Sequence, residues 1–119
     1  LRPSDGTENA IPLAQYRLTV EAVLKTTLEE TRARVIWATT TPVNEKWQSR
    51  RTEADVVAYN EAAVEISRRL GVEVNDLNRI VTEAGRDRLL TPDGVHFTEQ
   101  GRRVLGKAVA DFIRGLDAA

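Results

Sequence analysis

The residues best suited to catalysis lie in the stretch TPDGVHFTEQG, residues 91–101. This stretch holds the chain's only histidine, His96, and an acid three residues earlier, Asp93. A neutral imidazole is the usual general base near neutral pH, because its unperturbed pKa lies close to the working range. A carboxylate beside one ring nitrogen orients the imidazole and stabilises the imidazolium that forms. The spacing therefore predicts an acid–base pair, Asp93 and His96, on a tight loop that bends at Gly94.

A purely structural interpretation of this loop stays open, in which Asp93 caps a turn and His96 forms only local hydrogen bonds. The surroundings favour chemistry, because the loop directly precedes a predicted helix that would hold the histidine in place. In open α/β sheets, ligand sites form on such loops, outside the carboxyl ends of the strands.

The composition is that of an ordinary soluble domain and excludes several classes of function. The chain has 119 residues, 41% of them apolar and 29% charged, with a formal net charge of −1, so neither a nucleic-acid partner nor a membrane is expected. Because the chain has no cysteine, disulfides, thiolate metal sites and a cysteine nucleophile are excluded. One histidine with one nearby carboxylate is fewer ligands than a catalytic zinc needs, so no metal site is expected.

The first residues, LRPSDGTENA, lack a signal-peptide pattern and do not begin with Met. We therefore expect that Leu1 is not the native start, and that any signal peptide lies upstream of it. The compartment stays unknown, and a secreted or periplasmic location is compatible with the sequence.

Hydrophobic spacing predicts amphipathic helices around two short, buried strands. The long helices are expected at about residues 12–31, 53–70 and 98–116, the last with Leu105, Ala108, Val109, Phe112 and Ile113 facing inward. The strands are expected at 34–39 and 72–76, and a short helix from residue 77 is expected to stop at Gly85, before a loop at 86–97. Asp76 and Thr98 are the expected N-caps of the two helices that follow them.

This α-β-α-β-α-α order predicts parallel strand pairing and an α/β layer fold. Two strands cannot cover three amphipathic helices, because parallel sheets are normally buried on both faces. Further strands are therefore expected on another segment or chain, or copies of this chain assemble to complete the sheet.

The last block of the sequence, DGVHFTEQGRRVLGKAVADFI, resembles that of the SGNH hydrolases, also called the GDSL esterase/lipase family. In that block an Asp-x-x-His pair precedes the pattern H-[FLP]-[ST]-x-x-G, which His96, Phe97, Thr98 and Gly101 match. Upstream, VIWATTTPV resembles the family's strand with its Thr-Pro loop, and YNEAAVEISRRLGVEVNDL resembles its next helix and strand. The resemblance covers roughly residues 12–116.

The resemblance implies a three-layer, flavodoxin-like parallel sheet, of which this chain supplies the last two strands and the flanking helices. Residues 1–119 would be the C-terminal part of one hydrolase domain, with 1–11 as a loop and 12–116 as helices and strands. The family's nucleophile belongs to a G-D-S motif, but Ser4, Ser49 and Ser67 stand in other contexts, and Ser67 is expected to be a solvated helix residue. The nucleophile would then lie in the N-terminal half of the domain, which is the expected partner.

The implied activity is that of a serine esterase, which needs no metal or organic cofactor. The long polar loop at 41–53 and the absence of an apolar lid favour a small acyl group on a polar scaffold, such as O-acetyl groups on a carbohydrate. Thr40 and Thr41 follow a predicted strand and are candidate pocket residues, Arg51 can bind a substrate oxyanion or carboxylate, and Trp47 can stack on a sugar. Ordinary loop roles stay open for all four. A non-catalytic carbohydrate-binding or interaction domain that keeps the fold also stays open, and Trp37 is expected in the core.

Overall fold

The computed structural model describes residues 11–48 and 51–118. Ser4, Ser49 and most of the expected N-terminal loop lie outside the described residues. The elements in chain order are α1 (Leu13–Glu30), β1 (Ile36–Ala38), α2 (Glu53–Arg69), β2 (Glu73–Asn75), α3 (Leu77–Leu89) and α4 (Glu99–Ala118). This order confirms the α/β layer fold expected from the sequence, with each strand at the centre of its expected range.

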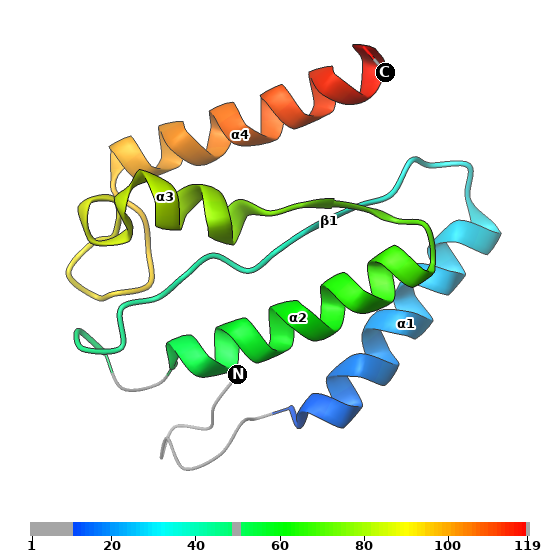
Figure 1. Cartoon of the computed structure of the whole chain (residues 1–119), viewed down its shortest axis with the longest axis horizontal. Coiled ribbons are helices and arrows are strands. Elements are labelled where there is room, and N and C mark those ends of the chain that lie inside the picture. The colour runs from blue at the N-terminus through cyan, green and yellow to red at the C-terminus, as the bar shows by residue number, and fades with distance from the viewer. Residues whose placement is uncertain (1–10, 49–50, 119) are drawn as a thin grey trace.

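The two strands pair in parallel, with Ile36 opposite Glu73, Trp37 opposite Val74 and Ala38 opposite Asn75. Helices α1 and α2 lie together on one side of the strands, and α3 and α4 lie on the other, so the arrangement is layered (Figure 1). Within the described part of the chain, the sheet consists of these two strands alone. The polypeptide leaves both strands toward the same edge, where the loops before α2 and α3 begin.

The core lies between α1, α2 and the start of β2. Its buried residues are Val20, Leu24, Ala63, Ile66 and Val72, and Tyr16, Val35, Trp37 and Leu70 pack against them. The expected helical stripe of α2 is confirmed, because Val56, Tyr59, Ala63 and Ile66 are all buried.

The expectation that Ser67 is solvated is wrong. Ser67 is fully buried in α2, next in sequence to the core residue Ile66. Its Oγ and the Nε1 of Trp37 are buried without a hydrogen-bond partner among the residues that the structure describes. A serine side chain is only slightly larger than that of alanine, so it fits a buried position. Its polarity therefore does not predict which face of α2 Ser67 occupies.

The expected helix stop at Gly85 is confirmed, because Gly85 adopts the non-helical angles φ +105° and ψ 86° and ends a first helical segment there. The expected loop at 86–97 begins too early, because a second helical segment of α3 follows the kink directly and continues to Leu89. Glycine tolerates positive φ at no steric cost. The turn beyond the kink is fixed by burial of Leu89 and Leu90 and by the hydrogen bond from Leu90 N to Arg86 O.

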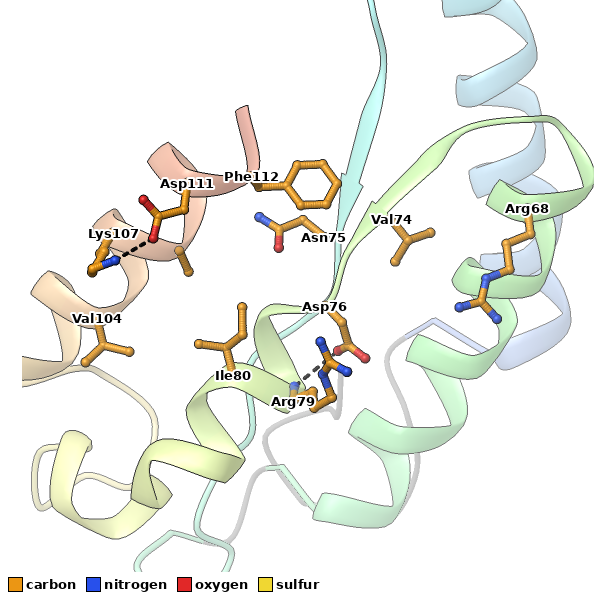
Figure 2. A pocket seen from close by; sticks show the side chains of 11 residues that line it. Arg68, Val74, Asn75, Asp76, Arg79, Ile80, Val104, Lys107, Asp111 and Phe112 are labelled. Atoms are coloured by element: carbon orange, nitrogen blue, oxygen red, sulfur yellow. Dashed lines mark hydrogen bonds and ion pairs between the residues drawn. The ribbon is translucent and has the colours of Figure 1, made fainter. Parts of the chain in front are cut away.

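Helix α4 has an apolar face that is only partly covered. Val109 and Ile113, which were expected to face inward, are 39% and 48% exposed. A hollow of about 660 Å³ lies between β2, α3 and α4, and Val74, Ile80 and Phe112 line it (Figure 2). The physical reason is the sheet shortage anticipated from the sequence, because two strands provide too little surface for α4 to cover.

Candidate active site

The carboxylate of Asp93 is held by four hydrogen bonds within its own loop. Its Oδ1 accepts from Thr91 Oγ1 at 2.8 Å and from the backbone N–H groups of Val95 and His96, both at 2.9 Å. Its Oδ2 lies 2.5 Å from Nδ1 of His96. The backbone N–H of His96 and then that of Val95 contribute most to holding the pKa of Asp93 far below its usual range. Asp93 is therefore an anion at any pH at which an esterase would work.

The imidazole of His96 is fixed on one side and open on the other. Its Nδ1 lies against Asp93 Oδ2, and the side chain is 80% exposed. Because a carboxylate accepts the Nδ1 proton, the neutral ring carries its lone pair on Nε2. The predicted contact between Asp93 and His96 is confirmed, and so is the turn-capping by Asp93 that the structural interpretation proposed. The arrangement can accept a proton at Nε2 and stabilise the imidazolium that results.

Short-range hydrogen bonds close the loop on itself before α4 begins. Thr91 N donates to His96 O at 2.9 Å, and Leu90 pairs with Phe97 as an isolated antiparallel bridge. Thr98 bonds Leu89 O through both its backbone N and its Oγ1, and the same Oγ1 accepts from Gly101 N at 3.1 Å. The predicted N-cap at Thr98 is thus confirmed, and it ties the start of α4 to the end of α3.

The segment after β1 supports this loop from outside. Asn44 N donates to Gly94 O at 2.9 Å, and buried Gly94 has φ +73°. A Cβ at position 94 would lie 2.6 Å from Asn44 O and 3.1 Å from the Cβ of Trp47, so only glycine fits. The side chain of Asn44 is buried, donates to Asp87 Oδ1 at 2.9 Å and accepts from Lys46 N at 3.0 Å.

Arg86, on α3, connects the segment after β1 to α2 and to α3. Its Nη1 donates to Val43 O at 2.9 Å and lies 3.4 Å from Glu53 Oε2, while its Nε donates to Asp87 Oδ1 at 2.8 Å. Glu53 in turn accepts from Val43 N at 2.9 Å. The hydrogen bond from Arg86 is the main cause that lowers the pKa of Asp87. Sequence reasoning missed Asn44, Glu53, Arg86 and Asp87, because these contacts join residues far apart in the chain.

The structure groups only two of the four predicted substrate-binding residues. Thr40 and Arg51 line one cavity of about 250 Å³, together with Tyr16, Val43, Val56 and Tyr59. Trp47 is 44% exposed and lines a separate hollow with Leu90 and Pro92, beside the Asp93 loop. Thr41 is half-buried and lines neither.

The backbone of Thr40 is held in place by amide side chains. Its N donates to Asn60 Oδ1 at 2.9 Å, and its O accepts from Asn60 Nδ2 at 2.8 Å and Asn78 Nδ2 at 3.0 Å. The side chain of Thr39 is also engaged, because its Oγ1 donates to Oδ1 of the predicted N-cap Asp76 at 3.0 Å. The carboxyl end of β1 is therefore rigidly attached to α2 and α3.

Two hollows of greater volume are lined by other residues. They measure about 660 and 610 Å³, and Arg68 and Asp76 contribute to both. Neither hollow is lined by Asp93 or His96. Within residues 11–48 and 51–118, no cluster of three or more His, Cys, Asp or Glu side chains could hold a metal ion. In the same ranges, no helix combines the length and the apolar character that a membrane span requires.

The α/β layer and the Asp93–His96 contact can be compared with known proteins. Residues 5–104 match the family described as GDSL-like lipase/acylhydrolase, and the chain belongs to this family. No protein of curated function matches the chain.

Two solved structures have a similar fold. One is a lipase/acylhydrolase from Enterococcus faecalis, with a TM-score of 0.78 and 25% identity, over 88% of this chain and 53% of that protein. The other is LAE5, an alpha/beta hydrolase enzyme from the metagenome of Lake Arreo in Spain, with a TM-score of 0.67 and 17% identity, over 87% of this chain and 48% of that protein. The chain thus spans about half the length of each.

Proposed function

We propose that the chain carries the acid–base pair of a serine esterase, and that the nucleophilic serine comes from polypeptide outside residues 1–119. One observation carries the proposal: Asp93 Oδ2 lies 2.5 Å from Nδ1 of His96, while the ring is largely exposed. This exposure leaves Nε2 accessible to a hydroxyl from outside the loop. Membership of a lipase/acylhydrolase family supports the hydrolytic reaction.

In the proposed reaction, the serine oxygen attacks the carbonyl carbon of an ester while Nε2 of His96 accepts the hydroxyl proton. Asp93 stabilises the imidazolium through the Nδ1 hydrogen bond. The tetrahedral intermediate collapses, the bond to the alcohol oxygen breaks, and His96 returns the proton to that oxygen. Water then attacks the acyl-enzyme, again with His96 as the base, and releases the acid and the free serine. Oxyanion donors would come from the same outside polypeptide.

The N-terminal part of the same domain is the proposed partner. Its strands would extend the sheet beside β1, and its side chains would cover the apolar face of α4. The exposed Val109 and Ile113, the hollow lined by Val74, Ile80 and Phe112, and the half-length match to both solved structures support this assignment.

The test compares variants of a polypeptide that extends the chain upstream in its natural sequence, with p-nitrophenyl acetate as substrate. His96→Ala is expected to lower kcat/KM by roughly 10³-fold or more. The melting temperature should not change, because the side chain is exposed. Gln100→Ala, an exposed position on α4, is the control and should keep full activity. Unchanged turnover in His96→Ala would sink the proposal.

The origin of the nucleophile has a separate test. The 119-residue chain alone should not react with a fluorophosphonate probe, and Ser67 in particular is buried in α2. Covalent labelling of any serine in this chain would contradict an external nucleophile.

We propose acetylated carbohydrate as the substrate class, because exposed Trp47 lies beside the Asp93 loop and can stack on a sugar ring. Release of acetate from acetylated xylan, weakened by Trp47→Ala with p-nitrophenyl acetate turnover unchanged, would support it. The second candidate is a carbohydrate-binding domain without catalysis. Binding to the same glycan by an extended polypeptide that hydrolyses no ester would favour that candidate.

A further inference from the structure

The cavity that Thr40 and Arg51 share is formed where three elements meet. Tyr16 comes from the first turns of α1, Val56 and Tyr59 come from α2, and Thr40 comes from the segment after β1. Helices that run antiparallel to the strands begin at the carboxyl edge of the sheet, which is where open α/β sheets bind ligands. Val43 of this cavity precedes Asn44, the residue that bonds the Asp93 loop, so the cavity and the loop share one supporting segment.

Arg51 gives this cavity a positive charge that no acid among the described lining residues balances. Its backbone is fixed on both sides by the side chain of Gln48, with hydrogen bonds of 2.8 and 2.6 Å. Its guanidinium has no ion pair or hydrogen bond to any of the residues that the structure describes. Among the described residues that line the cavity there is no acid, and the nearby carboxylate of Glu53 is already engaged by Arg86 and Val43 N.

The two tyrosines form the aromatic wall of the cavity. Their ring centroids are 4.9 Å apart, at an interplanar angle of 50°. The hydroxyl of Tyr59 donates to Ile11 O. Burial, followed by the proximity of Tyr59, raises the pKa of Tyr16, which therefore stays a neutral phenol able to donate a hydrogen bond.

We infer that this cavity is a subsite for a carboxylate carried by the ester substrate, with Arg51 binding the carboxylate and Tyr16 and Tyr59 packing against the adjoining ring or chain. The inference rests on the proposed esterase function only in assigning the bound carboxylate to the ester substrate. A planar carboxylate matches the guanidinium fork, and a single arginine balances one negative charge but not the two of a phosphate monoester. A volume of about 250 Å³ holds a fragment of a ligand, as a subsite does.

Binding can be measured without catalysis, because the only two tyrosines of the chain both line this cavity. The chain is labelled with ¹³C-tyrosine and titrated with benzoate, with neutral benzamide as the isosteric control. Benzoate should shift both tyrosine ring signals in a saturable way, with a Kd of about 1 mM, as expected for a fragment. Benzamide should bind at least tenfold more weakly.

Three variants separate the role of Arg51 from a general loss of charge. Arg51→Gln should weaken benzoate binding at least tenfold, and Arg51→Lys should weaken it less, because an ammonium keeps the charge but not the fork. Arg32→Gln, at an exposed position just after α1, removes the same charge and should leave the Kd unchanged. Absence of saturable shifts, equal binding of benzoate and benzamide, or an unchanged Kd in Arg51→Gln would each overturn the inference.

A kinetic comparison then asks whether the bound carboxylate belongs to the substrate. In the extended polypeptide, 4-acetoxybenzoate and mono-p-nitrophenyl succinate are each compared with their neutral methyl esters. For at least one pair, Arg51→Gln should lower kcat/KM for the carboxylate form at least tenfold and change that for the neutral form less than twofold. If neither pair shows this split, the subsite is not a substrate subsite. Unchanged turnover in His96→Ala would refute the esterase proposal without affecting benzoate binding by this chain. Failure of the esterase proposal and failure of the subsite inference are therefore distinguishable.

Discussion

Substitution of Gly94 by alanine tests the support of the Asp93 loop most directly. At φ +73°, an alanine costs about 1 kcal/mol relative to glycine. The added Cβ would lie 2.6 Å from Asn44 O, whereas ordinary contact begins at 3.4 Å, so the loop must withdraw by about 0.8 Å. This withdrawal weakens the hydrogen bond from Asn44 N to Gly94 O, which contributes about 1 kcal/mol. The expected loss in the free energy of unfolding is therefore about 2 kcal/mol.

Gly71 offers a matched control for this prediction. It has φ +76°, but a Cβ there would meet no atom within 4 Å, so Gly71→Ala should cost only the backbone term of about 1 kcal/mol. Both variants are unfolded in urea and assayed for kcat in the extended polypeptide. Because a displacement of about 1 Å can cost 10²-fold in rate, Gly94→Ala should lose at least tenfold in kcat and Gly71→Ala should lose none. Equal stability losses, or full activity in Gly94→Ala, would refute the close-contact argument.

Three further predictions concern single side chains. Asp93→Asn should lower kcat/KM by roughly 10²- to 10⁴-fold, because the orienting carboxylate is lost. The pKa of Asp93 in the folded protein lies below the unfolded value of 3.8, so the carboxylate stabilises the fold fully above that pH and progressively less below it. The urea stabilities of wild type and variant should therefore converge as the pH falls toward 2. Ser67→Ala should unfold at the same or a higher urea concentration, because it removes a buried hydroxyl without a described partner, and a loss above 1 kcal/mol would reveal a missed hydrogen bond. Asn44→Ala should lower kcat more than it raises KM in steady-state assays, because its buried side chain holds the segment that bonds Gly94. Equal effects on kcat and KM would assign it a role in binding.

Local signals made much of the fold and half of the candidate site predictable. The period of the apolar residues in α2, the caps at Asp76 and Thr98 and the Asp93–His96 contact all depend on residues within a few positions of one another. Such interactions are encoded by spacing alone.

The mistaken predictions have a common physical cause, because each depended on distant neighbours. The segment after Gly85 is helical to Leu89, and not yet the expected loop, because Leu89 and Leu90 are buried there. Ser67 is buried because of the helix face that it occupies. Val109 and Ile113 stay exposed because no described layer covers them. Thr40 and Arg51 line one cavity together with Tyr16, and no spacing rule connects Tyr16 to either residue.

The four hydrogen bonds of Asp93 all come from residues 91–96, so the geometry between carboxylate and imidazole is independent of how helices and sheet are placed. Strain elsewhere in the protein can change the distance from His96 Nε2 to a distant hydroxyl, but it leaves the bond to Asp93 intact. Mutations in the core and mutations in this turn should therefore leave different kinetic signatures. The first kind should slow the proposed attack on the ester, and the second kind should disturb the orientation of the ring against Asp93.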